Sequence, residues 1–568
     1  MVLVGKGASY GIALGKALII ENEPLNIEKK NIENIEVEKN KFLEAIKISK
    51  EQLTKVKDKA LKELGEEKAA IFEAHLMILE DPEMVDQTVQ KIENEKINAD
   101  YAFEGIANQF IMIFESMDNE YMKERAADIK DVSDRILRNI LGEHVVDLSM
   151  LEKEVILIAD DLTPSDTATM DKEKVLGFLT NIGGKTSHTA IMARSLEIPA
   201  VVGLGNITAK VKNEDYIIFN GETGEVIIHP TEEEIKKYQD LKESYEKERK
   251  ELEKVKGQKS ITLDGREVEL VGNIGTPKDL EGLLKNDAEG VGLYRTEFIY
   301  MDRDSMPTEK EQFESYKKVL EGLNGKPVVI RTLDIGGDKK LPYLKIDEEM
   351  NPFLGYRAIR LCLDKQDIFK TQLRALLRAS VYGNLKIMFP MISSLEELLA
   401  AKEILNEVKK DLENESIKYA ENIEVGMMIE VPSAAMISDL LAKHVDFFSI
   451  GTNDLIQYTT AVDRMNEKIH HLYSPLNPAV LRLIKMVIDN GHKENIWVGM
   501  CGEAAGDKKM IPILLGMGLD EFSMSASSIL PARKMIRSLS AEKTKKIADE
   551  VLSMGSVTEI ESYLEINL

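Results

Sequence analysis

The sequence has few residues suited to cross-linking and no stretch suited to a membrane. Its 568 residues include only two cysteines, Cys362 and Cys501, which cannot form a disulfide framework and indicate a reducing compartment. No window approaches the roughly 20 continuous apolar residues that a membrane span needs. The apolar run at the N-terminus, MVLVGKG, is too short for a signal peptide. These absences argue against a secreted, disulfide-stapled protein and against a membrane protein, and they predict a cytoplasmic one.

Basic residues are also scarce relative to acidic ones. The chain has 74 Lys and Arg residues against 99 Asp and Glu residues, which gives a formal net charge of −25. This balance argues against nucleic acid or an anionic membrane surface as a partner, whereas it would suit a basic protein. No segment has the composition of a disordered region. A chain of this length is too long for one hydrophobic core, so we expect about two to four domains.

One stretch combines glycines, hydroxyl residues and an imidazole: Gly183-Gly184-Lys185-Thr186-Ser187-His188, followed by a helical run. Thr186 or Ser187 can cap a helix that begins near His188. The N–H groups at a helix N-terminus attract anions and disfavour a protonated imidazole. Such a histidine suits a phosphohistidine, in which a ring nitrogen attacks and the helix end receives the phosphoryl oxygens. The motif alone fits a purely structural capping role equally well.

Two further motifs follow in the second half of the chain. One is Ile450-Gly451-Thr452-Asn453-Asp454-Leu455-Ile456-Gln457, followed by Arg464, and the other is Gly499-Met500-Cys501-Gly502-Glu503. With the His188 loop, and in this order, they resemble the phosphoenolpyruvate-utilising enzymes over essentially the whole chain. Among these, the chain is most similar to enzyme I of the sugar phosphotransferase system. The resemblance implies that His188 takes the phosphoryl group of phosphoenolpyruvate and passes it to the phosphocarrier protein HPr, releasing pyruvate. It also implies Mg²⁺ as cofactor and a homodimer.

The first half of the chain reads as an α/β domain interrupted by helices. Residues 1–22 and 144–230 alternate strand and helix patterns and predict an α/β domain that carries His188. Residues 23–143 predict an inserted bundle of about four helices. By the resemblance, this insertion docks the phosphocarrier protein. Residues 231–259, rich in Lys and Glu, predict a helical linker. A seam of side chains at helical spacing marks the bundle core: Phe42, Ile46, Ser49, Leu53, Val56 and Ala60.

Residues 260–568 predict a TIM barrel, because eight candidate strands alternate with helical segments. The candidate strands lie at 267–273, 290–294, 327–332, 385–390, 423–429, 446–450, 496–500 and 520–523. Chemistry in this fold takes place at the carboxyl ends of the strands. The conspicuous polar residues fall at those ends: Arg295, Arg331, Glu430, Asn453 with Asp454, and Cys501.

A site for phosphoenolpyruvate needs cations and a metal. Arg295 and Arg331 can each form a planar fork on phosphate oxygens, and Arg464, Arg357 and Arg360 are further candidates to hold the anion. Glu430 and Asp454 are the predicted metal ligands, because Mg²⁺ prefers oxygen ligands and commonly takes one or two protein carboxylates. Asn453 would donate a hydrogen bond to the substrate.

The remaining assignments come largely from the resemblance. Cys501 would protonate the methylene carbon of the enolate, a role that suits a thiol acting as a general acid. Cys362 is expected to be a buried structural thiol, and His75 in the helical insertion a structural histidine. Thr167 matches a family position near the phosphorylated histidine. Thr167 and Arg194 are predicted to support His188.

Two rival functions remain open. A dikinase or phosphoenolpyruvate synthase would share the His188 domain and the barrel. It would also need a nucleotide-binding domain, and the sequence shows no glycine-rich P-loop. A regulatory paralogue that senses phosphoenolpyruvate often carries an added sensory domain, which is not visible here. Turnover with the carrier protein would separate an enzyme from such a regulator.

Overall fold

The computed structural model describes residues 1–20, 25, 27–64, 66–116, 120–142, 151, 153–162, 170, 174–184, 188–196, 198–301, 303–337, 339, 341–344, 347, 349–466 and 468–568. The chain forms two compact units, Met1–Glu248 and Arg249–Leu568. Each unit has its own buried hydrophobic clusters. No described helix combines the length and the apolar character that crossing a membrane would need.

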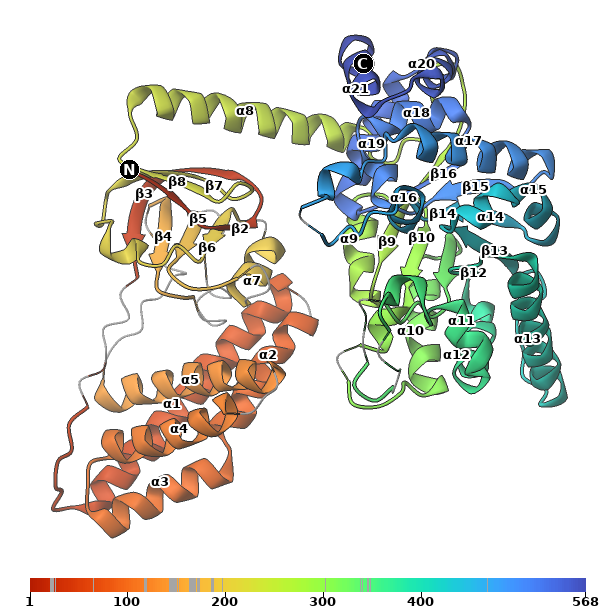
Figure 1. Ribbon diagram of the computed structural model, residues 1–568. Helices are drawn as coiled ribbons and strands as arrows, with labels where there is room; N and C mark the ends of the chain where they lie inside the picture. Colours follow the sequence, from red (N-terminus) through yellow and green to blue (C-terminus); the bar gives the residue numbers. More distant parts are fainter. Residues whose placement is uncertain are drawn as a thin grey trace. The chain divides into compact units, whose positions relative to one another are not determined.

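The first unit contains a sheet of eight strands in the order β1-β8-β7-β3-β4-β5-β6-β2 (Figure 1). The strands are β1 (Val2–Val4), β2 (Lys6–Ser9), β3 (Ile12–Ile19), β4 (Val155–Ala159), β5 (Val175–Thr180), β6 (Ala200–Val202), β7 (Tyr216–Asn220) and β8 (Glu225–Ile228). Strands β3 to β6 run parallel, and Ala17 of β3 lies opposite Ile156 of β4. The sheet therefore joins chain segments from before and after the helical insertion.

The helical insertion is a bundle between β3 and β4. Its helices are α1 (Ile35–Leu64), α2 (Glu66–Leu79), α3 (Pro82–Glu95), α4 (Ala99–Glu115) and α5 (Glu120–Leu141). On the predicted seam, Phe42, Leu53 and Val56 lie in the buried core. Ser49 is also buried and donates to the Ala45 carbonyl at 2.8 Å. The side chain of Ala60 lies outside the described residues.

Two local features of this bundle concern a helix cap and His75. Helix α2 ends at Leu79, and Asp81 caps α3 by accepting from Glu83 N at 2.9 Å and from Met84 N at 3.3 Å. Pro82 occupies the first turn, where its missing N–H costs nothing. His75 is fully buried, and its Nε2 lies 3.2 Å from Asp128 Oδ1, so its side chain is held in the core of the bundle.

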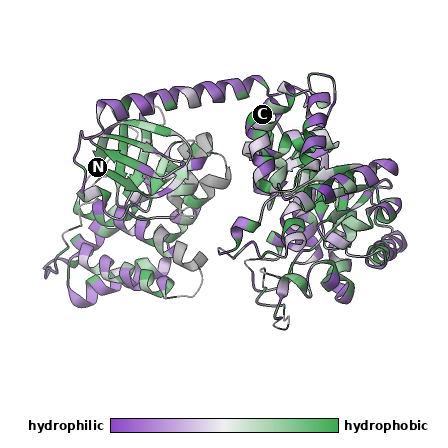
Figure 2. Ribbon diagram, turned by 45° about the horizontal axis from the view of Figure 1, so that its top comes forward, coloured by the Kyte–Doolittle hydropathy of each residue, from purple (hydrophilic) through white to green (hydrophobic). Residues whose placement is uncertain are grey.

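Helix α7 (His188–Leu196) follows β5, and helix α8 (Glu232–Lys254) follows β8. The helix expected near His188 therefore begins at that residue. Figure 2 shows α8 coloured mostly as hydrophilic, and Tyr238 is its one buried residue. The division between the two units falls inside α8, between Glu248 and Arg249.

The second unit is a closed barrel of parallel strands in the order β9 to β16, which confirms the predicted TIM barrel. The strands are β9 (Glu269–Ile274), β10 (Val291–Arg295), β11 (Pro327–Arg331), β12 (Asn384–Phe389), β13 (Glu424–Ile429), β14 (Phe447–Ile450), β15 (Trp497–Met500) and β16 (Glu521–Met524). Each overlaps a strand expected from the sequence. An apolar layer formed by Leu293, Val329, Met388, Met428 and Phe447 fills the barrel interior.

Helices surround the barrel (Figure 1). They are α9 (Leu280–Lys285), α10 (Glu309–Gly322), α11 (Ile359–Asp364), α12 (Gln366–Ala379), α13 (Leu395–Asn414), α14 (Pro432–Met436), α15 (Ser438–Leu441), α16 (Thr452–Thr460), α17 (Pro478–Lys493), α18 (Met510–Met517), α19 (Ala526–Ser538), α20 (Ala541–Ser553) and α21 (Val557–Asn567). Their apolar faces and the outward side chains of the strands form one continuous core.

The Asp81 cap gives a test of the bundle. Asp81→Ala removes the acceptor of two backbone N–H groups and is expected to lower the free energy of unfolding of the bundle by about 1 kcal/mol. Chemical denaturation followed by far-ultraviolet circular dichroism would measure the change. Asp86→Ala, which removes the same charge from an exposed position of α3, is the control. Equal stability losses in both variants would rule out a capping role for Asp81.

Candidate active site

A cavity of about 850 Å³ opens at the carboxyl ends of the barrel strands. Arg295 and Arg331 are the last residues of β10 and β11. Glu430 and Cys501 directly follow β13 and β15. With the exception of Arg360, the barrel residues placed in the predicted site all line this cavity: Arg295, Arg331, Arg357, Glu430, Asn453, Asp454, Arg464 and Cys501.

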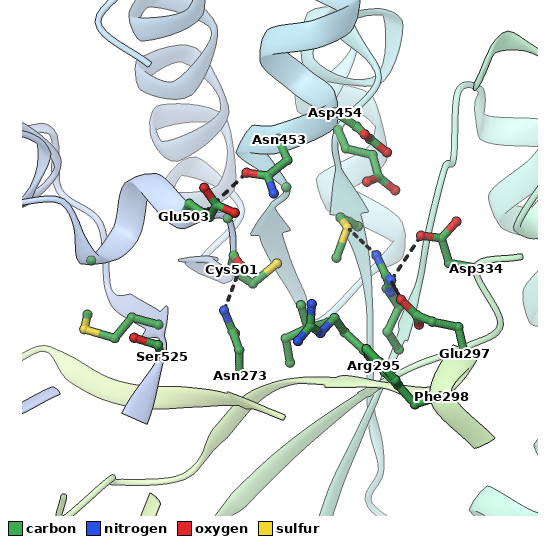
Figure 3. Close-up of a pocket in the computed structure, with 18 of the residues that line it drawn as sticks. Asn273, Arg295, Glu297, Phe298, Asp334, Asn453, Asp454, Cys501, Glu503 and Ser525 are labelled. Carbon is green, nitrogen blue, oxygen red and sulfur yellow. Dashed lines mark hydrogen bonds and ion pairs between the residues drawn. The ribbon is translucent and has the colours of Figure 1, made fainter. Parts of the chain in front are cut away.

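Buried ion pairs hold Arg331 in place. Its Nη2 lies 2.8 Å from Glu297 Oε1 and 3.0 Å from Asp334 Oδ2; Figure 3 labels these two carboxylates. Lys339 Nζ approaches the same Glu297 oxygen at 2.7 Å. Burial opposes the charge of Asp334, but Arg331 and Arg357 outweigh it and hold the pKa of Asp334 far below its usual range. The network is therefore fully ionised.

Arg357 extends this network across the cavity. Its Nη2 lies 2.8 Å from Asp334 Oδ1 and 3.2 Å from Asp454 Oδ2, and its Nη1 donates to Tyr458 OH at 3.2 Å. Within the described part of the chain, the buried Nε atoms of Arg331 and Arg357 have no hydrogen-bond partner. Buried donors without partners are rare in folded proteins. Both Nε atoms are buried as well as unpaired within that part of the chain, so the other parts of the two guanidinium groups are the ones that line the cavity.

Glu430 and Asp454 form the carboxylate side of the cavity. Glu430 is 2% exposed and accepts a hydrogen bond from Met391 N at 2.6 Å. Burial and the nearby Asp454 raise the pKa of Glu430 to about 8, although Arg331 and Arg357 act in the opposite direction. A cation beside these two carboxylates would favour their ionised forms.

The residues present fit a divalent metal. The candidates are the two carboxylates of Glu430 and Asp454, because the described residues contain no group of three or more His, Cys, Asp or Glu side chains that could hold a metal ion. Mg²⁺ is commonly bound by one or two carboxylates, with substrate oxygens and water completing its shell. The cavity lining carries five cationic side chains and six carboxylates. A multiply charged anion therefore needs an additional cation.

Cys501 lies at the centre of the cavity floor, with Asn453 and Glu503 beside it in Figure 3. Asn273 Nδ2 donates to the Cys501 carbonyl at 3.1 Å and Ser523 Oγ donates to Asn273 Oδ1 at 2.6 Å, which fixes the backbone here. Burial raises the pKa of the Cys501 thiol to about 12. The thiol therefore stays protonated at neutral pH and can act as a proton donor.

The other candidates occupy different positions around the cavity. The Arg295 guanidinium stacks 5.2 Å from the centre of the Phe298 ring, and Asn453 Oδ1 accepts from Glu503 N at 3.4 Å. Arg464 is anchored by its backbone N–H, which donates to Gln457 Oε1 at 3.0 Å.

Arg360 is not among the residues that line the cavity. Its Nη1 donates to the carbonyls of Leu354 and Gly355 at 3.0 and 3.1 Å. The expectation that it reaches the site is therefore wrong in this structure. Cys362 is buried, as expected: its thiol donates to the Leu333 carbonyl at 3.9 Å and packs in the barrel core.

In the first unit, His188 is the first residue of α7. Its side chain lies outside the described residues, as do Thr167, Thr186 and Ser187. Ala190 and Ala193 pack α7 into the buried cluster beside the sheet. Arg194 Nη1 donates to the Ala8 carbonyl at 3.0 Å. This bond ties α7 to β2, and the supporting role beside His188 stays a prediction.

Sequence reasoning missed several residues of the cavity: Asn273, Glu297, Asp334, Lys339 and Glu503. Glu297 and Asp334 each follow a strand end by two or three residues, so the rule that selected Arg295 and Arg331 could have found them. No comparable signal marks Lys339, because it reaches the site from a loop after β11.

Comparisons with known proteins find the same enzyme family along 99% of this chain. Three models of the PEP-utilising enzymes match: the N-terminal domain over residues 4–125, the mobile domain over 151–224 and the PEP-binding domain over 249–541. The phosphoenolpyruvate-protein phosphotransferase of Priestia megaterium is 57% identical over 561 residues, which cover 99% of this chain and 98% of the relative. That of Bacillus subtilis (strain 168) is 56% identical over 563 residues, covering 99% of each chain.

A solved structure also matches the first part of the chain. A solution NMR structure of an Enzyme I protein is 52% identical and covers 43% of this chain and 99% of its own, with a TM-score of 0.39.

The shared carboxylate gives a test of the arginine network. Asp334→Asn leaves two buried guanidinium groups without their common counter-charge, and we expect the barrel to lose about 3 kcal/mol of unfolding free energy. Denaturation followed by the fluorescence of Trp497, the single tryptophan, reports on the barrel. Asp549→Asn, at an exposed position of α20, is the control. A barrel as stable in Asp334→Asn as in the control would show that the network is not what holds these arginines.

Proposed function

The chain belongs to the PEP-utilising enzyme family, and from this premise we propose that it is a phosphoenolpyruvate–protein phosphotransferase of the enzyme I type. It transfers the phosphoryl group of phosphoenolpyruvate to its own His188 and then to a histidine of the phosphocarrier protein HPr, releasing pyruvate. The observation that carries the proposal is the barrel cavity, which the guanidinium groups of Arg331 and Arg357 line together with the carboxylates of Glu430 and Asp454.

The arginines bind the substrate. The guanidinium groups of Arg331 and Arg357 are oriented by Asp334 before any ligand arrives, so binding costs little further ordering of these side chains. Arg295 and Arg464 add positive charge at other parts of the lining. Asn453 offers an amide donor. Together these groups hold the phosphate and the carboxylate and offset the charge that develops as the enol oxygen departs.

Glu430 and Asp454 would hold the metal, and we propose Mg²⁺. When bound, the ion would withdraw charge from the phosphoryl oxygens and the leaving oxygen. The chain's own part is to supply two carboxylates that are close enough to raise the pKa of Glu430. This mutual repulsion favours uptake of a cation at this position over others in the cavity.

The phosphoryl group passes to His188. A ring nitrogen forms a bond to phosphorus while the bond from phosphorus to the enol oxygen of phosphoenolpyruvate breaks, which leaves the enolate of pyruvate. Because α7 begins at His188, the N–H groups of its first turn can receive the transferred oxygens. Thr167 is proposed to orient the imidazole.

Cys501 completes the reaction. Its thiol gives a proton to the methylene carbon of the enolate, which yields pyruvate and leaves a thiolate. Arg331 lowers the pKa of Cys501 against the larger effect of burial, so the thiolate forms beside a positive charge. Solvent returns the proton when pyruvate leaves.

The phosphorylated histidine must then meet the carrier. We propose that HPr docks on the helical insertion, residues 23–143. An exposed apolar side chain supports this, since Met77 of α2 is 75% exposed, and the net charge of −25 suits a basic partner. We further infer that the His188 unit approaches the barrel for the first transfer and leaves it for the second. A homodimer formed through the barrel and a cytoplasmic location are part of the same proposal.

Labelled phosphoenolpyruvate tests the nucleophile. With Mg²⁺ and no nucleotide, the wild-type chain is expected to acquire an acid-labile, base-stable label that HPr removes. His188→Ala should acquire none, because the attacking nitrogen is gone. His229→Ala, at an exposed histidine of the same unit whose side chain is 65% exposed, should label like the wild type.

The same experiment separates the rivals. Label that persists in His188→Ala would mean that another residue is the nucleophile. Label that forms only when ATP or AMP is present would identify a dikinase. Label that forms without nucleotide but never passes to HPr would favour a regulatory protein.

Cys501→Ala tests the proton donor. We expect pyruvate release in a single turnover to slow by roughly 10²- to 10⁴-fold, the usual contribution of a general acid. The affinity for phosphoenolpyruvate should change little, because the arginines and the metal site are intact. Cys362→Ala, at the other buried cysteine, is the matched control. Unchanged pyruvate release in Cys501→Ala would exclude the thiol as the proton donor.

A further inference from the structure

The barrel has a second cavity, at the amino ends of its strands. This basal cavity has a volume of about 570 Å³, and its lining includes Glu269, Lys386, Trp497, Asp520 and Glu521. Glu269, Trp497 and Glu521 are the first residues of β9, β15 and β16, and Lys386 is the third residue of β12. It is therefore separated from the candidate active site by the apolar layer of the barrel.

Most carboxylates around the basal cavity already have partners. Glu424 receives Lys386 Nζ at 2.9 Å and Trp497 Nε1 at 2.8 Å. Asp520 accepts from Val498 N at 2.9 Å and pairs with His492 at 2.8 Å. At the edge of the cavity, Glu267 pairs with Lys259, and Glu289 accepts from Ser260 Oγ.

Glu521 differs from these carboxylates because one of its oxygens has no partner in the described part of the chain. It is 2% exposed, and within the described residues its buried Oε1 has no hydrogen-bond partner. Gly499 leaves room for this oxygen, since a Cβ at that position would lie 2.8 Å from Glu521 Oε1. Glu269, paired in register with Glu521 on the neighbouring strand β9, is exposed at the cavity and likewise has no partner among the described side chains. A buried carboxyl group without a partner is costly.

The volume and lining of the basal cavity limit the kinds of ligand that would fit it. The described residues contain no cluster of carboxylates arranged to coordinate a metal ion. The volume greatly exceeds that of one water or ion, which is about 30 Å³. Val268 and the edge of the Trp497 ring add apolar wall next to the two carboxylates, because the ring itself is stacked on Phe447 and has Lys386 Nζ 4.5 Å from its centre. These features match an ammonium group on a short hydrocarbon stem.

We propose that the basal cavity binds a primary ammonium compound with a short hydrocarbon stem, held by the carboxylates of Glu521 and Glu269. The ammonium group lies beside the carboxyl groups of Glu521 and Glu269 on neighbouring strands, which are about 4.8 Å apart. The stem packs against Val268 and Trp497. The site is independent of the phosphoryl transfer at the other end of the barrel.

Protonation supports this assignment. Burial, with Glu269, Glu424 and Asp520 adding to it and Lys386 opposing it, raises the pKa of Glu521 to about 8. Without a ligand the group is therefore mostly neutral at pH 7. A bound ammonium ion would favour the ionised form and release a proton. The affinity should consequently rise with pH until about the pKa of Glu521 and then level off.

The single tryptophan makes the test direct, because Trp497 lines the cavity. We would titrate the full-length protein with n-butylammonium chloride and follow tryptophan fluorescence. The expected result is a saturable change that n-butanol and MgCl₂ do not produce. Glu521→Gln should weaken binding by roughly tenfold or more, since it removes a charge-assisted hydrogen bond, and should abolish its pH dependence. Glu550→Gln, at an exposed position of α20, should bind like the wild type.

A second variant guards against a folding artefact in the first. Glu269→Gln changes an exposed carboxylate and should also weaken binding, while phosphoryl transfer remains at the wild-type rate in both variants. No saturable change in the wild type would overturn the proposal. Equal affinity in Glu521→Gln, equal binding of n-butanol, or saturation by MgCl₂ alone would overturn it as well.

Discussion

The shared buried carboxylate of Asp334 is the interaction on which the candidate active site depends. Arg331 and Arg357 come from separate segments of the barrel, and Asp334 contacts Nη2 of both, at 3.0 and 2.8 Å. Two buried guanidinium groups this close would repel each other without a shared counter-charge, even though Glu297 and Asp454 each pair with one of them. With Asp334 between them, both guanidinium groups keep a fixed orientation at the wall of the cavity. The network thus makes a preorganised anion site.

This arrangement also explains why the cavity needs a metal. The carboxylates that orient the arginines cancel their charge, so the lining has slightly more acidic than basic side chains. A carboxylate that fixes the position of an arginine also reduces the attraction of that arginine for an anionic substrate. The proposed divalent cation between Glu430 and Asp454 would add positive charge while Asp334 still holds Arg331 and Arg357.

The sequence predicted most of the fold because the fold depends on local patterns. The barrel strands are short apolar runs between amphipathic helices, and the carboxyl ends of those runs led to Arg331, Glu430 and Cys501. Asp334 and Lys339 were missed because their roles depend on loops that return to the cavity after β11. Strand periodicity says nothing about such loops. Arg360 was misplaced for the same reason, since the chain after Gly355 turns its guanidinium toward the Leu354 carbonyl.

Buried carboxyl groups at the two ends of the barrel have different charged neighbours, which shift their pKa values. At the carboxyl ends of the strands, arginines keep Asp334 ionised, whereas Glu430, next to Asp454, has its pKa raised to about 8. At the amino ends, Glu521 has only Lys386 to oppose burial and three other carboxylates, and its pKa is also raised to about 8. A cation beside either glutamate would favour its ionised form. Because the apolar layer separates them, the two ends can take up different cations, and the chemistry of each is decided by the groups at its own end.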